Sequence, residues 1–347
     1  MCVEKIGEYT FETGIYRPPS EGGSFSLLLR ITRNCPWNRC TFCFMYKTEK
    51  YSLRSVEELK QDVDSIAAIC DNLITTSNRL GLNGQLTQPV VMEVINKEPL
   101  LGSSQGFMMI LNWLNSGGKT AFLQDANTMN MRSENLIEIL KYIRKSFPTL
   151  ERVTSYARSK TVGKKEPEEL KAICEAGLDR LHIGLESGDD EILKHVKKGV
   201  TAEEHIIAGK KAMAAGFQLS EYWMPGLGGK EKWEDHARNT AKVLNQINPN
   251  FIRSRPFFPM EGTPIADEYQ RGELTLLTPR EQLLELKLMM QELTFDSRVC
   301  FDHAGNHWRN RQGGSLFSLG YEGYKFPREK EDVLELIEEG LEVVGSE

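Results

Sequence analysis

The sequence predicts an α/β fold, a partial (β/α)6 TIM-like barrel with a C-terminal cap. Three observations favour this architecture. Short apolar runs alternate with amphipathic helical segments from about residue 119 to residue 255. The helical segments are long enough to cross back over a parallel sheet. The alternation continues for six strands, which is typical of a barrel rather than of a short doubly wound sheet.

The barrel is predicted to begin with an apolar strand over residues 24–32, after a polar lead that contains two adjacent prolines. A helix then opens at Ser55, where a capping box to Glu58 precedes apolar residues at helical spacing. Residues 78–105 are rich in glycine and asparagine near their start and show no clear periodicity, so we interpret them as an insertion near the site.

The regular repeat follows this insertion. Strands are predicted over residues 119–124, 152–157, 180–185, 218–224 and 251–255, and helices over residues 133–146, 167–176, 202–215 and 232–247. A second capping box, from Thr201 to Glu204, marks the start of the helix at 202. Beyond residue 264 we expect a polar linker, a helix around 279–293 and an irregular aromatic tail. The predicted parts are therefore a lead (1–23), a barrel (24–265) and a cap (266–347).

Composition narrows the class of protein. A chain of 347 residues that is 40% hydrophobic can bury a large core without disulfides. A formal net charge of −6 argues against a nucleic-acid partner. No apolar run reaches the roughly 18 residues that a membrane span needs, and the first residues lack the order of a secretory signal. The seven cysteines, an odd number, suit a reducing compartment, so we expect a cytoplasmic protein with no membrane partner.

Three cysteines follow the first strand directly. Cys35, Cys40 and Cys43 form the pattern C-x4-C-x2-C, and no fourth Cys or His lies nearby in the sequence. A four-iron cluster normally takes four cysteines and structural zinc takes four ligands, so three thiolates leave a coordination position open. The pattern predicts a catalytic, oxygen-sensitive cluster that binds a small molecule at one iron. The alternatives are a structural zinc loop and a cluster that only carries electrons.

Two further stretches extend this pattern, AGLDRLHIGLESGDD at residues 176–190 and KGVT at residues 198–201. With the cysteines they resemble the radical S-adenosylmethionine (SAM) superfamily over about residues 24–264. Within it they resemble the branch of elongator-type acetyltransferases, methylthiotransferases and oxygen-independent coproporphyrinogen oxidases. The resemblance implies a 4Fe-4S cluster on Cys35, Cys40 and Cys43, SAM as the second cofactor, and an external electron donor of the flavodoxin or ferredoxin type.

The chain departs from this family in two places. The family usually has three residues between its first two cysteines, whereas Cys35 and Cys40 enclose four. The usual Gly-Gly-Glu after the second strand is replaced by Gln124-Asp125-Ala126-Asn127. The resemblance implies that Gln124, Asp125 and Asn127 accept hydrogen bonds from the methionyl ammonium of SAM, and that the backbone of Phe42 lies near the adenine. A strand-ending turn and loop packing are the structural alternatives.

The third and fourth strand ends carry further polar residues. Tyr156 and Arg158 are two apart and point to one face, where Arg158 either meets the carboxylate or ribose of SAM or is solvated. By the family pattern Glu186 binds the ribose diol. Lys198 stands where related sequences carry an arginine for the SAM carboxylate, although lysine lacks the bidentate fork. A surface lysine is the alternative.

Residues at the ends of the fifth and sixth predicted strands are candidates for contacts with adenine and with the substrate. The turn at Gly226 and Leu227 lets the backbone approach a flat ligand, which the resemblance identifies as adenine. Arg253 and Arg255 alternate on the sixth strand and predict an inward basic pair for an anionic substrate, or else solvated side chains. His303, in the aromatic tail, is a candidate general acid or base, or a residue that fixes a loop.

These features predict a radical SAM enzyme that takes hydrogen from an unidentified small-molecule or peptide substrate. Two alternatives remain at this point. One is a non-catalytic iron–sulfur or zinc protein that serves electron transfer or redox sensing. The other is an enzyme that uses SAM as a methyl or aminocarboxypropyl donor.

Overall fold

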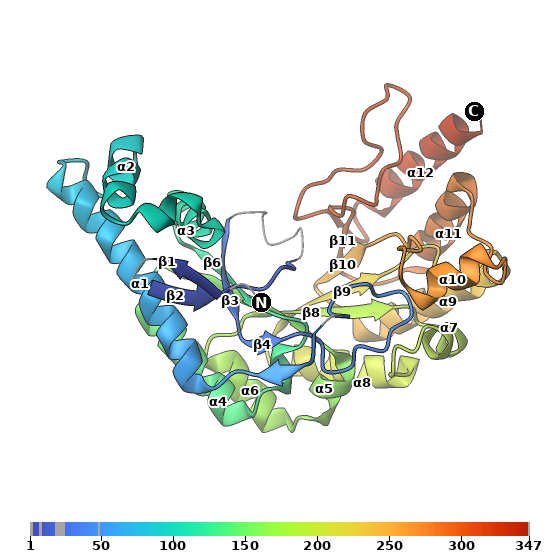
Figure 1. Ribbon diagram of the computed structural model, residues 1–347. Helices are drawn as coiled ribbons and strands as arrows, with labels where there is room; N and C mark the ends of the chain where they lie inside the picture. Colours follow the sequence, from blue (N-terminus) through green and yellow to red (C-terminus); the bar gives the residue numbers. More distant parts are fainter. Residues whose placement is uncertain (1–2, 7–8, 18–24, 48, 346–347) are drawn as a thin grey trace. The chain divides into compact units, whose positions relative to one another are not determined.

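The computed structural model describes residues 3–6, 9–17, 25–47 and 49–345 (Figure 1). Its contacts divide the chain into two compact units. The first comprises Met1–Pro36, Lys50–Tyr156 and Lys171–Arg180, and the second comprises Trp37–Glu49, Ala157–Leu170 and Leu181–Glu347.

The first unit is built on three parallel strands in the order β3 (Ser26–Arg30), β6 (Thr120–Gln124), β7 (Arg152–Ala157). Strands β1 (Val3–Ile6) and β2 (Tyr9–Glu12) form an antiparallel pair, as do the short strands β4 (Thr32–Arg33) and β5 (Ser52–Leu53). The helices are α1 (Val56–Arg79), α2 (Gln88–Lys97), α3 (Gln105–Asn115) and α4 (Ser133–Ser146), with 3-10 turns at Pro99–Ser103 and Thr128–Asn130. Helix α6 (Pro167–Glu175) belongs partly to each unit.

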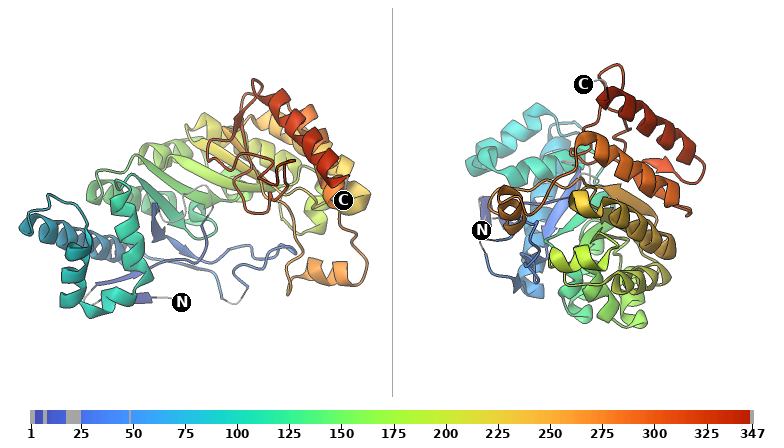
Figure 2. Two further views of the ribbon diagram at one scale, coloured as in Figure 1. Left: turned by 90° about the horizontal axis from the view of Figure 1, so that it is seen from above. Right: turned by 90° about the vertical axis from the view of Figure 1, so that its right-hand side faces the viewer.

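The second unit continues the alternation. Its strands run in the order β8 (Arg180–Glu186), β9 (Gln218–Trp223), β10 (Phe251–Ser254), β11 (Arg298–Cys300), β12 (Tyr324–Lys325). Strands β9, β10 and β11 are parallel, and β12 is antiparallel to β11. The helices are α5 (Ser159–Lys164), α7 (Asp190–His195), α8 (Ala202–Ala214), α9 (Gly229–Ile247), α10 (Pro264–Gln270), α11 (Pro279–Glu292) and α12 (Lys330–Val344). Figure 2 shows α11 packed between α9 and α12.

Both predicted capping boxes are present. At the start of α1 the Ser55 hydroxyl accepts from the Glu58 N–H at 3.1 Å, and the Glu58 carboxylate accepts from the Ser55 N–H at 2.8 Å. At the start of α8 Thr201 and Glu204 make the same reciprocal pair, with distances of 3.2 and 3.1 Å. Each box satisfies two N–H groups that the first helical turn leaves without a partner.

The predicted fold class, an α/β fold of the partial (β/α)6 barrel type, is confirmed by these parallel strands and intervening helices. Several segments are more regular than predicted, and one of them is the lead, which contains β1 and β2. Residues 78–105 contain α2, and the tail contributes β11 and β12 to the sheet and ends in α12. Residues 1–2, 7–8 and 18–23 of the predicted lead, and residue 24 of the first strand, lie outside the described residues. The division at 1–23, 24–265 and 266–347 stays a prediction.

Candidate active site

Cys35 follows strand β4 in the first unit, and the residue before it is held by a buried carboxylate. The backbone N–H of Asn34, whose φ is 65°, donates to Asp125 Oδ2 at 2.9 Å. The Asn34 side chain donates to the carbonyl of Lys50 at 3.1 Å. The thiol of Cys35 is half-buried. The end of β6, where Asp125 lies, therefore fixes the backbone at the first cysteine.

Cys40 and Cys43 lie in the second unit, on a loop that is pinned by backbone hydrogen bonds. Thr41 donates to the carbonyl of Val196 at 3.0 Å, and its own carbonyl accepts from the N–H of Ile265 at 3.3 Å. Both cysteine thiols are half-buried. Among the described residues, no three His, Cys, Asp or Glu side chains converge as a group that could hold a metal ion.

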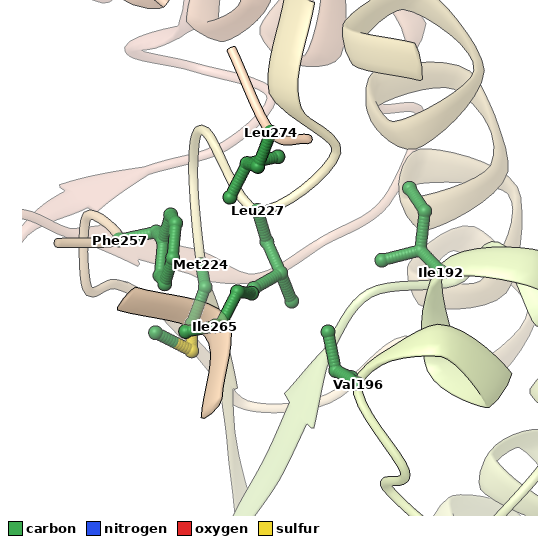
Figure 3. Close-up of a cluster of buried hydrophobic side chains, with 7 residues drawn as sticks. All are labelled: Ile192, Val196, Met224, Leu227, Phe257, Ile265 and Leu274. Atoms are coloured by element: carbon green, nitrogen blue, oxygen red, sulfur yellow. The ribbon is translucent and has the colours of Figure 1, made fainter. Parts of the chain in front are cut away.

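An apolar cluster supports the same loop. Figure 3 shows its buried side chains. They come from α7 and the residue after it, from the turn after β9, and from the chain after β10, which includes α10. Phe42 packs against them. They are Ile192, Val196, Met224, Leu227, Phe257, Ile265 and Leu274. Leu227 is thus a core residue whose side chain is only 2% exposed, and its predicted cofactor contact would come from the backbone.

Trp37, one of the four residues between Cys35 and Cys40, anchors the loop to the turn after α7. Its indole N–H donates to the carbonyl of Lys197 at 2.7 Å. The guanidinium groups of Arg39 and Arg158 lie 5.1 and 5.0 Å from its ring centroid, within cation–π range. The ring also covers Gly199, whose φ is 73°. Sequence reasoning missed Trp37 as a site residue, although its place inside the lengthened cysteine spacing was a usable signal.

Gly199→Ala is expected to destabilise the protein by about 2 kcal/mol or more, because the new Cβ would overlap the Trp37 ring at a left-handed backbone position. Gly272→Ala is the matched control, since Gly272 has a φ of 72° but nothing within 4 Å of the added carbon. Urea denaturation measures both variants. Equal losses in the two would show that the Trp37 ring does not constrain Gly199.

Glu186 and Lys198 form a buried ion pair at the end of β8. Lys198 Nζ lies 2.8 Å from Glu186 Oε1, and the two side chains are only 11% and 9% exposed. The carbonyl of Lys198 accepts from Arg158 Nη2 at 2.8 Å. The second carboxylate oxygen, Glu186 Oε2, is buried and has no hydrogen-bond partner. Such an oxygen is costly unless a ligand supplies a donor.

These charged groups lie close enough to Cys40 to act on its thiol. Burial raises the pKa of Cys40, while Lys198 and Arg158 lower it and Glu186 raises it. The structure therefore brings Cys40, Glu186, Lys198 and Arg158 together within the second unit. A thiol, an unpartnered carboxylate oxygen and a fixed cation suit a ligand with hydroxyls and a carboxylate, such as SAM.

The end of β6 carries three of the predicted SAM ligands, and the side chains of Gln124 and Asp125 bind other residues of the first unit. The amide of Gln124 is bound by the N-terminal lead, since its Oε1 accepts from the Gly14 N–H at 2.8 Å and its Nε2 donates to the carbonyls of Gly14 and Tyr16. Asp125 Oδ2 accepts from Arg30 Nε at 2.8 Å. Asn127 is fully buried.

The other oxygen of Asp125 remains available. Asp125 Oδ1 is buried and has no hydrogen-bond partner, and burial raises the pKa of this carboxyl group. On the neighbouring strand β7, Tyr156 is half-buried and packs edge-on against Phe122 with ring centroids 5.0 Å apart. Within the first unit, Asp125 Oδ1 is therefore the side-chain acceptor best suited to an ammonium ligand.

The two arginines of the predicted basic pair, at the end of β10, differ in how deeply they are buried. Arg253 is fully buried, its Nη1 lies 2.7 Å from Asp302 Oδ2, and its Nε donates to the Ser220 hydroxyl at 3.1 Å. Its guanidinium also lies 4.7 Å from the Tyr321 ring centroid. Arg255 is half-buried, so it is the better placed of the two for an anionic ligand.

His303 lies near Arg255 after β11. Burial, and then the charge of Arg255, lower the pKa of His303 to about 4. Its Nδ1 accepts from the Gly305 N–H at 3.1 Å, which leaves the proton on Nε2. At neutral pH His303 is thus a neutral ring and a hydrogen-bond donor through Nε2, and it would be only a weak general base.

The chain belongs to the Radical SAM superfamily, because the sequence model of that family matches residues 29–239. It is 29% identical over 112 residues to the tRNA uridine(34) acetyltransferase of Methanocaldococcus jannaschii, a match that covers 30% of this chain and 20% of that protein. It is 27% identical over 233 residues to the 4′-phospho-dehydrooxetanocin synthase of Priestia megaterium, which covers 64% of this chain and 27% of that protein. The chain therefore spans only about a fifth to a quarter of these relatives.

The chain is also similar to two solved structures. Elp3 of Methanocaldococcus infernus is 16% identical with a TM-score of 0.47, covering 73% of this chain and 61% of that chain. Coproporphyrinogen III oxidase (HemN) of Escherichia coli is 14% identical with a TM-score of 0.43, covering 78% and 53%.

Membership of the superfamily confirms three predictions. The protein is an enzyme, its cofactors are a 4Fe-4S cluster and SAM, and its chemistry requires an electron donor. In the part of the chain that the structure describes, no helix is both long and apolar enough to cross a membrane.

Proposed function

We propose that the protein cleaves SAM reductively and uses the resulting 5′-deoxyadenosyl radical to take hydrogen from an anionic small-molecule or peptide substrate. The observation that carries this proposal is the buried Glu186–Lys198 pair beside Cys40, with Glu186 Oε2 lacking a partner. A protein that only transfers electrons has no need of a ligand site of this kind next to its cluster.

Different residues would hold the cluster and SAM. Cys35, Cys40 and Cys43 would bind three irons of the cluster, and the fourth iron would bind SAM. Lys198, oriented by its pair with Glu186, would attract the SAM carboxylate, and Arg158 would add positive charge there. Glu186 Oε2 would accept from the ribose hydroxyls.

The remaining contacts follow the family pattern. Asp125 Oδ1 would accept from the methionyl ammonium, and Tyr156 and Asn127 would line the same strand ends. The backbone of Phe42 and of the turn at Gly226 and Leu227 would lie along the adenine. Gln124 would act indirectly, by holding the chain at Gly14.

The substrate site would lie at the carboxyl ends of β10 and β11. These strands are parallel, so Arg255 and His303, which follow them, lie at the same edge of the sheet. Arg255 would attract a carboxylate or phosphate, and His303 would donate from Nε2. We place the enzyme in the cytoplasm, where a flavodoxin or ferredoxin would supply the electron, and we propose no nucleic-acid partner.

The direct test is anaerobic reconstitution with iron and sulfide, followed by dithionite and SAM. We expect 5′-deoxyadenosine, detected by chromatography, and none when dithionite is omitted. A fully loaded sample that forms no 5′-deoxyadenosine would contradict the proposal and favour an electron carrier. Methylthioadenosine in its place would indicate an aminocarboxypropyl transfer.

A further inference from the structure

A buried histidine–glutamate pair lies beneath the end of β8. His236 on α9 and Glu285 on α11 are both 0% exposed, and His236 Nδ1 lies 2.7 Å from Glu285 Oε1. The other ring nitrogen, Nε2, lies 3.3 Å from the backbone carbonyl oxygen of Glu186. The other carboxylate oxygen, Glu285 Oε2, accepts from the backbone N–H of Gly226 at 2.6 Å.

The contacts of His236 fix one of its two hydrogen bonds by direction. The backbone carbonyl of Glu186 only accepts hydrogen bonds, so His236 Nε2 donates to it. The ring and the carboxyl group share one proton between Nδ1 and Glu285 Oε1. Because both side chains are fully buried, removal of the Glu285 carboxyl group would leave Nδ1 and the Gly226 N–H without partners in the core.

The pair reaches two backbone positions that have a positive φ, and one of them is not a glycine. Glu186 has a φ of 65°, which a residue with a side chain rarely adopts, and Gly226 has a φ of 85°. The carbonyl of Glu186 accepts both from His236 and from the N–H of Met224, at 3.3 and 3.0 Å. A left-handed glutamate persists only where its surroundings fix it, and here two donors do so.

We propose that Glu285 is a positioning residue for SAM. Through His236 it fixes the backbone that aims the Glu186 carboxylate, and through the Gly226 N–H it fixes the glycine turn. This inference rests on the proposed function, because it assumes that Glu186 and Gly226 contact SAM. Glu285 lies outside the family match at residues 29–239, so a helix of the C-terminal part would set the geometry of the cofactor site.

The test compares SAM binding in Glu285→Leu with a matched surface variant of the same helix. Glu292→Leu is the control, since Glu292 is 44% exposed and pairs with Arg238 on α9. Reconstituted proteins are assayed for bound iron, for thermal unfolding, and for SAM affinity by anaerobic equilibrium dialysis. We expect Glu285→Leu to keep its iron and to bind SAM roughly 10- to 100-fold more weakly, as is typical when the partner of a ligand-holding residue is removed. Glu292→Leu should bind as the wild type does.

A conservative variant separates positioning from folding. In Glu285→Gln the amide oxygen can accept from the Gly226 N–H while the amide N–H donates to His236 Nδ1, so we expect SAM affinity close to the wild-type value. Wild-type affinity in a destabilised Glu285→Leu, or weak SAM binding in a folded Glu285→Gln, would overturn the inference. Failure of the wild type itself to bind SAM would overturn the proposed function instead.

Discussion

Cys40→Ala is expected to lose the brown colour of the cluster and the cleavage of SAM together. Removing one of three thiolates leaves two protein ligands, which is too few to retain a 4Fe-4S cluster with one open iron. Burial raises the pKa of the Cys40 thiol, and the positive charges of Lys198 and Arg158 offset part of that rise. Bound iron, the visible absorbance spectrum and 5′-deoxyadenosine are measured on the same sample.

The control for this variant is Cys174→Ala. Cys174 is half-buried on α6 and lies outside the C-x4-C-x2-C pattern, so its loss should change neither iron content nor SAM cleavage. If Cys40→Ala retained both colour and cleavage, Cys40 would not be a cluster ligand.

Asp302→Asn is expected to lower the free energy of unfolding by about 3–5 kcal/mol, the usual cost of removing one partner from a buried ion pair. Arg253 is 0% exposed and Asp302 8% exposed, so water cannot solvate the arginine that remains. Urea denaturation of the wild type and the variant measures the difference.

The double variant Arg253→Met/Asp302→Asn should regain much of this stability, because methionine removes the buried charge and fills a similar space. A loss of less than about 1 kcal/mol in the single variant would show that Arg253 is satisfied without Asp302.

Local signals in the sequence were sufficient for strands β3 and β6 to β10 and for the helices α1, α4, α6, α8, α9 and α11. The boxes at Ser55 and Thr201 place helix starts because they depend only on residues three apart. Helix α2 was missed because it offers no side-chain cap and buries only Val90 and Val94. Strand β11 was missed because three residues are too short for an alternation to be recognised.

The candidate site was predictable where it follows a motif and not where it depends on distant contacts. Glu186 and Lys198 lie within a recognisable stretch, but that stretch does not show that the two side chains pair with each other, and their cofactor roles stay predictions. Alternation predicted that Arg253 and Arg255 form an inward basic pair, but it did not show that Arg253 is buried against Asp302, 49 residues further along the chain. Glu285 stands likewise 49 residues from His236, with no motif to connect the two.

The hydrogen bonds of Gln124 limit how far the protein can be shortened at its amino end. A chain that began after Tyr16 would leave a buried amide without the backbone groups of Gly14 and Tyr16 that it now binds. Two donors and an acceptor would lose their partners next to Asp125. Truncation or tagging at the amino end should therefore leave Gly14 and Tyr16 in place, because their backbone groups hold the amide next to Asp125, whose carboxylate binds the residue before the first cysteine.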